Sequence, residues 1–127
     1  MNCASEAAAR GWSGRIVLAC LLHDASEAYI ADIIRPVKPY LTNYLYIEAQ
    51  IMDVIYDYFE PADLTPEEKK FCKQIDDEMM EHELRQMMPE RVTDRRLILM
   101  SEPHFIERPY REVEEELKVW LKNIQRI

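Results

Sequence analysis

Glycine is nearly absent from this sequence: among 127 residues there are only two, Gly11 and Gly14. Phosphate-binding loops of the P-loop and Rossmann types need several closely spaced glycines, so both classes of site are excluded. The alternation of apolar and polar residues that is typical of half-buried strands is missing as well. The chain is therefore predicted to be all-α.

Cysteines and long apolar runs are also scarce. The three cysteines, Cys3, Cys20 and Cys72, are an odd number without a CxxC motif, and two of them lie in apolar helical segments. They are predicted to be reduced, buried thiols of a cytoplasmic protein. No apolar stretch approaches the length of a membrane span, and the first residues do not have the layout of a signal peptide.

Basic residues are outnumbered by acidic ones, 16 against 24, and the net charge is −8. Non-specific binding to nucleic acid or to an anionic membrane surface needs the opposite balance, so neither is expected. Hydrophobic residues make up 48% of the chain and charged residues 31%. These proportions are typical of a globular protein, and the length fits one domain that spans residues 1–127.

Start and stop signals divide the chain into helices. "CASEAAAR" (residues 3–10) is rich in strong helix formers and is interrupted by "GWSG". Ser13 is a candidate N-cap for a second helix that runs to about Ile30, before the prolines of "RPVKP". The later helices are predicted over residues 42–59, 66–88, 92–100 and 109–125. In the fourth, Thr65, Pro66 and Glu68 form a capping-box signal.

Apolar stripes define the buried faces of two of these helices. In the third helix the stripe is predicted to comprise Leu45, Ile47, Ile51, Met52, Ile55 and Phe59. In the last helix it is predicted to comprise Val113, Leu117, Trp120, Leu121 and Ile124.

Polar residues interrupt the apolar faces of the second helix. Helical spacing gives two neighbouring stripes, one of Ile16, Cys20, His23, Glu27 and Ile30, the other of Val17, Leu21, Asp24, Ala28 and Ala31. Burying ionised carboxylates costs several kcal/mol each unless a cation compensates. A divalent ion held by an imidazole and carboxylates is one explanation. A structural polar cluster around a buried histidine is the other, and the spacing does not separate them.

A further carboxylate interrupts the fourth helix. Asp76 lies beside Ile75 and shares a face with Met80, so it is either another ligand or part of a solvated acidic face. His82 lies on a different side of that helix, and His104 lies in a loop between prolines. Neither is expected to be a ligand.

Longer motifs carry a resemblance to a known family. "LLHDASEA" (residues 21–28), "RPVK" (35–38), "YIE" (46–48) and "KQIDDEMMEHE" (73–83) are similar to the HD superfamily of metal-dependent phosphohydrolases. They are most similar to its branch of bacterial 5′-nucleotidases. The likeness extends over about residues 2–90. It implies an HD-domain-like bundle of about five to six helices. It also implies an enzyme that hydrolyses a small phosphorylated metabolite, such as a nucleoside monophosphate.

The resemblance assigns roles to individual residues. His23, Asp24 and Asp76 would bind a divalent ion (Mn, Co, Fe, Ni, Zn or Mg), with Asp77 as the alternative to Asp76. Glu27 and Asp32 would position the attacking water and the substrate. Lys38 and Arg35 would face the phosphate, as cations should.

The same resemblance implies one missing ligand. The family's first metal-binding histidine lies ahead of the segment that matches "NCA" (residues 2–4), so the chain is expected to be an N-terminally shortened member with weaker activity. Loss of covering helices would expose apolar surface, and a homo-oligomer is therefore expected. The alternative is a non-catalytic helical module that keeps the fold and serves interaction or oligomerisation.

Overall fold

A single buried helix organises the fold. In the computed structural model, which describes residues 1–59, 64–88 and 98–124, this helix is α2 (Gly14–Leu22). Every residue from Ile16 to Leu22 is buried. A helix that is apolar on all sides must be covered on all sides, and the other helices surround it: α1 (Asn2–Ala9), α3 (Thr42–Phe59), α4 (Pro66–Met87) and α5 (Tyr110–Ile124). The described residues contain no strand, so the prediction of an all-α protein is confirmed.

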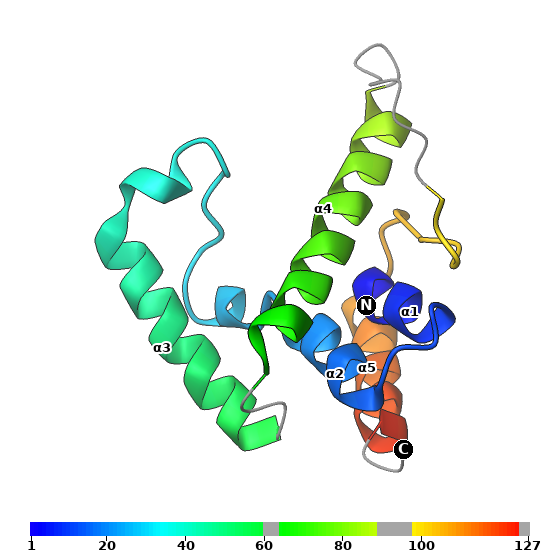
Figure 1. Ribbon diagram of the computed structural model, residues 1–127. Coiled ribbons are helices and arrows are strands. Elements are labelled where there is room, and N and C mark those ends of the chain that lie inside the picture. Colours follow the sequence, from blue (N-terminus) through cyan, green and yellow to red (C-terminus); the bar gives the residue numbers. More distant parts are fainter. Residues whose placement is uncertain (60–63, 89–97, 125–127) are drawn as a thin grey trace.

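The helices differ in how closely they pack against α2. α1, α4 and α5 gather around it, whereas α3 stands to one side (Figure 1). The core combines Ala4 and Ala7 of α1 with Ile75 and Met79 of α4 and with Ile124 of α5. From α3 only Ile55 is fully buried. No described helix has both the length and the apolar character needed to cross a bilayer.

The predicted signals at helix ends are largely confirmed. α1 ends in a Schellman motif, in which Gly11 has φ +73° and Trp12 N–H donates to Ala7 O at 3.1 Å. Thr65 and Glu68 form the predicted capping box at the start of α4. Ser13 is the N-cap of α2, but its side chain makes no capping hydrogen bond.

One helix prediction was wrong, and a second was wrong in the part that the structure describes. The second helix does not run to Ile30: α2 ends at Leu22, and after His23 and Asp24 a 3-10 turn, η1 (Ala25–Ala28), follows. The His23 ring turns back on α2, with Nδ1 2.8 Å from Cys20 O, and so satisfies a carbonyl that a longer helix would have used. The predicted helix over residues 92–100 lies partly outside the described residues, and residues 98–100 are not helical.

The buried face predicted for α3 was also partly wrong. Leu45 and Ile47 are exposed, whereas Ile51, Met52 and Phe59 pack at the edge of the core around Ile55. The reason is that only the C-terminal half of α3 reaches α2. In α5, Leu117, Trp120, Leu121 and Ile124 pack against the core as predicted.

A buried carboxylate that the sequence analysis did not single out ties the bundle together. Glu6 of α1 is fully buried. It accepts hydrogen bonds from Met100 N–H, Ser101 N–H and Ser101 Oγ at 2.6–3.0 Å, and it pairs with Arg10 Nε at 2.7 Å. Arg10 in turn pairs with Glu78 of α4. Burial raises the pKa of Glu6, but these hydrogen bonds together lower it below its ordinary value.

Replacing Glu6 by glutamine is expected to destabilise the protein. The Glu6→Gln change keeps the shape, leaves Arg10 with Glu78 as its remaining charge partner and places an amide group against N–H donors. Breaking a buried charge pair in this way costs about 3 kcal/mol. Urea unfolding followed by circular dichroism measures the loss, with the exposed Glu107→Gln as the matched control, expected to change stability by less than about 0.5 kcal/mol.

The same pair of proteins tests the pH dependence. Because the pKa of Glu6 is lowered by folding, its contribution is complete above the ordinary glutamate pKa of about 4.3 and is lost as the pH falls through the folded-state value. The stability gap between wild type and Glu6→Gln should therefore narrow as the pH falls below about 4.3. A gap that is constant from neutral to acid pH would show that the charge of Glu6 does not stabilise the fold.

Candidate functional site

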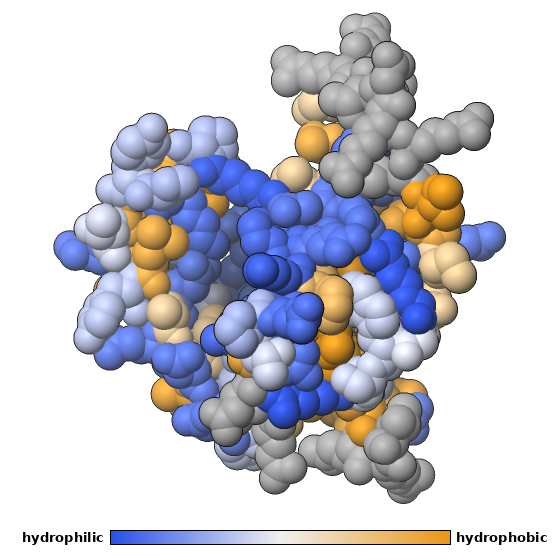
Figure 2. All heavy atoms as spheres, in the orientation of Figure 1, coloured by the Kyte–Doolittle hydropathy of each residue, from blue (hydrophilic) through white to orange (hydrophobic). Residues whose placement is uncertain are grey.

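The predicted site residues surround one hollow between α3, α4 and the segment that joins α2 to α3. A pocket of about 600 Å³ is lined by Asp24, Glu27, Asp32, Arg35, Lys38, Lys73 and Asp76 together with apolar side chains. A second pocket of about 430 Å³ shares Asp24, Lys38, Lys73 and Asp76 and adds His23. Figure 2 shows hydrophilic surface across this region, with α3 on its left. The seven residues predicted from the sequence thus lie together, although they come from three separate parts of the chain.

His23 is the centre of the arrangement. Its Nδ1 faces the carbonyl of Cys20 at the end of α2, which turns Nε2 outward. Nε2 lies 2.9 Å from Asp24 Oδ2 and 3.7 Å from Asp76 Oδ1. Burial lowers the pKa of His23, but the contacts with the two carboxylates outweigh it and raise the pKa to about 12. In this state the ring is an imidazolium held between two carboxylates.

The choice between Asp76 and Asp77 is decided by their neighbours. Asp76 faces both His23 and Arg35, whose Nη2 lies 2.6 Å from Asp76 Oδ2. The contact with His23 lowers the pKa of Asp76, against the effect of burial. Asp77 pairs with Arg35 Nη1 at 2.7 Å and with Lys73 at 3.2 Å. Asp76 is therefore the α4 carboxylate that joins the His23 cluster.

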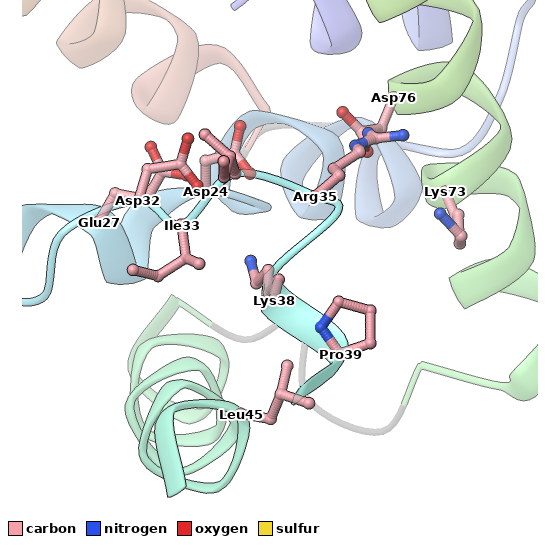
Figure 3. Close-up of a pocket in the computed structure, with 11 residues that line it drawn as sticks. Asp24, Glu27, Asp32, Ile33, Arg35, Lys38, Pro39, Leu45, Lys73 and Asp76 are labelled. Atoms are coloured by element: carbon pink, nitrogen blue, oxygen red, sulfur yellow. Dashed lines mark hydrogen bonds and ion pairs between the residues drawn. The ribbon is translucent and has the colours of Figure 1, made fainter. Parts of the chain in front are cut away.

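The two predicted cations, Arg35 and Lys38, attach the segment that joins α2 to α3 to two different helices. Arg35 binds α4 through Asp76 and Asp77, whereas Lys38 binds α3, with Nζ 2.7 Å from Glu48 Oε1. Tyr44 supports the α3 contact, because its hydroxyl donates to Ala31 O at 2.8 Å. Figure 3 shows Lys38 between the carboxylates of one wall and the Arg35–Asp76 pair. Both cations border the pocket and are neutralised within it.

Glu27 and Asp32 form the acidic wall beside Asp24 (Figure 3). Partial burial raises the pKa of Glu27, and the negative charges of Asp24 and Asp32 raise it further. A carboxylate with a raised pKa exchanges protons more readily near neutral pH than an ordinary glutamate. This is the property required of a group that orients or deprotonates water.

The donor set fits a divalent ion in chemistry but is not arranged as a metal site. One imidazole nitrogen and two carboxylates are ligands that transition ions accept. Within residues 1–59, 64–88 and 98–124, however, no group of three or more His, Cys, Asp or Glu side chains is disposed to hold a metal ion. Ion pairs explain the difference, since Asp24 and Asp76 share His23, and Arg35 takes the second oxygen of Asp76.

Two residues of the site were not predicted from the sequence, Lys73 and Glu48. Lys73 lies three residues before Asp76, and this helical spacing could have placed it on the same side of α4. Glu48 lies in the quoted "YIE" motif, but its pairing with Lys38 depends on the path of the connecting segment. The other two histidines lie elsewhere: His82 contacts Gln86 and Phe105, and the backbone of His104 binds Asn2.

No protein-family model, curated protein or solved structure matches this chain. The family resemblance therefore rests on the motifs quoted above, and the arrangement of the site rests on the geometry of this chain alone.

Proposed function

We propose that this protein is a divalent-metal-dependent phosphohydrolase of the HD type, which acts on a small phosphorylated metabolite such as a nucleoside monophosphate. One observation carries the proposal: His23 and Asp24 meet Asp76 at a pocket that Glu27, Asp32, Arg35 and Lys38 also border. The hollow offers both an acidic wall and cations, which a phosphate ester and its attacking water require. The cytoplasm, where thiols stay reduced, is the compartment that fits this role.

Each residue has a defined part in the proposal. His23, Asp24 and Asp76 would hold the ion, which when bound polarises a phosphoryl oxygen and acidifies water. Glu27, with its raised pKa, would accept a proton from the attacking water, and Asp32 beside it would orient that water or the substrate. Arg35 and Lys38 would neutralise the phosphate.

The ion-paired state of the site gives the proposal a further consequence. For His23 and Asp76 to hold a metal ion, His23 would have to lose its proton and Asp76 its pair with Arg35, so binding should be weak and weaker in acid. Once Asp76 is engaged elsewhere, Arg35 would keep its pair with Asp77 through Nη1, and Nη2 would become available to a phosphate. The same exchange that admits the ion would thus supply a cation for the phosphate.

Removing the Asp76 charge is expected to abolish metal-dependent turnover. The Asp76→Asn variant should lower the phosphatase rate on a panel of nucleoside monophosphates by about 100-fold, with a parallel loss of bound Mn²⁺. Asp77→Asn is the matched control, because Asp77 shares Arg35 but not His23; its loss should be less than about tenfold. Steady-state rates and metal content after dialysis are the measurements.

Wild type without Mn²⁺-dependent phosphatase activity on this panel would contradict the proposal. Equal effects of the two substitutions would show that Asp76 acts only through Arg35.

A second candidate function is that of a non-catalytic module that associates with a second copy of the chain. The observation in its favour is the outer surface of α3, where Tyr46, Ile47, Val54 and Tyr58 are exposed. Exposed apolar side chains that gather on one element are typical of interfaces. This function needs no metal, and it is also compatible with an oligomeric enzyme.

A polar substitution on α3 is expected to weaken self-association. Val54 is 69% exposed and Tyr58 is 79% exposed, so the Val54→Glu/Tyr58→Glu double variant should fold normally and shift a dimer toward monomer by at least tenfold in Kd, about 1.4 kcal/mol. Sedimentation velocity over a concentration series measures the shift, with Asp57→Lys on the same helix as a charge-change control. A wild type that is monomeric at millimolar concentration would contradict this prediction.

A further inference from the structure

Two cysteine thiols from distant parts of the sequence face each other beneath the site. Cys20 Sγ of α2 lies 3.4 Å from Cys72 Sγ of α4. The S–S bond of a disulfide is about 2.05 Å long, so the two sulfur atoms are already in contact and need only a small further approach to form one. The helices that carry them pack directly against each other through the core, which holds the pair together.

The two thiols differ in exposure. Cys20 is 1% exposed, whereas Cys72 is partly exposed and lines the pocket that also contains His23 and Asp24. A small oxidant in this pocket can therefore reach the thiol of Cys72, whereas the thiol of Cys20 is buried. The difference in exposure makes Cys72 the thiol that an oxidant attacks and Cys20 the resolving thiol that then forms the disulfide.

The third cysteine has a different neighbour. Cys3 is buried, and its Sγ lies 3.9 Å from His23 Nε2. Among the described residues, the thiols of Cys20 and Cys72 are in hydrogen-bonding contact with each other, whereas that of Cys3 contacts His23. A disulfide should therefore join Cys20 to Cys72 and leave Cys3 out.

We propose that Cys20 and Cys72 form a reversible disulfide that cross-links α2 to α4 in response to peroxide. Hydrogen peroxide oxidises the Cys72 thiol to a sulfenic acid and is reduced to water. The Cys20 thiol then attacks the sulfenic sulfur, an S–S bond forms, and a second water leaves. A dithiol reductant reverses the reaction by exchange through a mixed disulfide.

The bond would act on the site through both of its ends. The backbone carbonyl oxygen of Cys20 lies 2.8 Å from His23 Nδ1, and Cys72 lies one helical turn before Asp76. The cross-link would therefore fix the separation of the two elements that carry His23 and Asp76. The chemistry of disulfide formation depends only on the thiols and is independent of the proposed phosphohydrolase activity.

The test is alkylation of the full chain after peroxide treatment. The protein is exposed to hydrogen peroxide, unfolded in acid, alkylated, and analysed by intact mass and peptide mapping. We expect one of three thiols to be alkylated, a disulfide-linked peptide pair containing Cys20 and Cys72, and recovery of three alkylated thiols after dithiothreitol. This measurement on the wild type needs no variant to fold.

Matched variants assign the roles. Cys3→Ser should form the disulfide as wild type does. Cys20→Ser should stop at a Cys72 sulfenic acid that dimedone traps, and Cys72→Ser should give neither product, with circular dichroism checking that each variant folds. Three alkylated thiols after peroxide in the wild type, or a linked peptide that contains Cys3, would overturn the proposal.

Discussion

The buried carboxylate of Glu6 is the interaction on which the arrangement of helices depends. An ionised group without solvent must be paired, and its partners here come from α1 itself, from residues 100–101 and, through Arg10, from α4. Apolar contacts are non-directional and would tolerate many ways of stacking short helices around α2. The Glu6 network is directional and restricts them, because residues 100–101 and Arg10 must reach the same two oxygens. Arg10 also pairs with Glu78 and so ties α4, which carries Asp76, to α1.

The site continues the same principle at the C-terminal end of α2. The helix ends where His23 caps it, and the polar residues that follow turn into solvent-accessible space instead of into the core. His23 then gathers Asp24 and Asp76, and Arg35 gathers Asp76 and Asp77. Every charge in this chain of contacts neutralises another. A ligand that enters must replace these ion pairs, so its binding free energy is only the difference between its own contacts and those that it breaks.

The sequence predicted the fold class and several boundaries well, because these depend on local chemistry. The Thr65–Glu68 capping box and the end of α1 at Gly11 each need only a few neighbouring residues. The residues predicted for the site from spacing and motif lie around one hollow, and Asp76 lies beside His23; their roles stay a prediction. The end of α2 could not be predicted from local sequence. A helix through His23 to Ile30 satisfies the apolar periodicity equally well, and the deciding contact is a side chain turning back on a carbonyl.

The contacts that the sequence could not predict are those made between distant segments. Glu6 is an ordinary residue in an alanine-rich helix until Ser101 and Met100 reach it. The exposure of Leu45 and Ile47 on α3 likewise follows from where the helix lies, not from its pattern.

The position of α3 rests on two kinds of contact. Its C-terminal half packs through Ile55 and neighbouring apolar side chains, whereas its N-terminal half is joined to the connecting segment through Lys38 and Glu48. At about 1 M salt the Debye length falls to about 3 Å, which suppresses interactions between separated surface charges but screens a part-buried pair in direct contact much less. Concentrated salt should therefore leave both attachments of α3 in place, and with them the hollow that α3 borders.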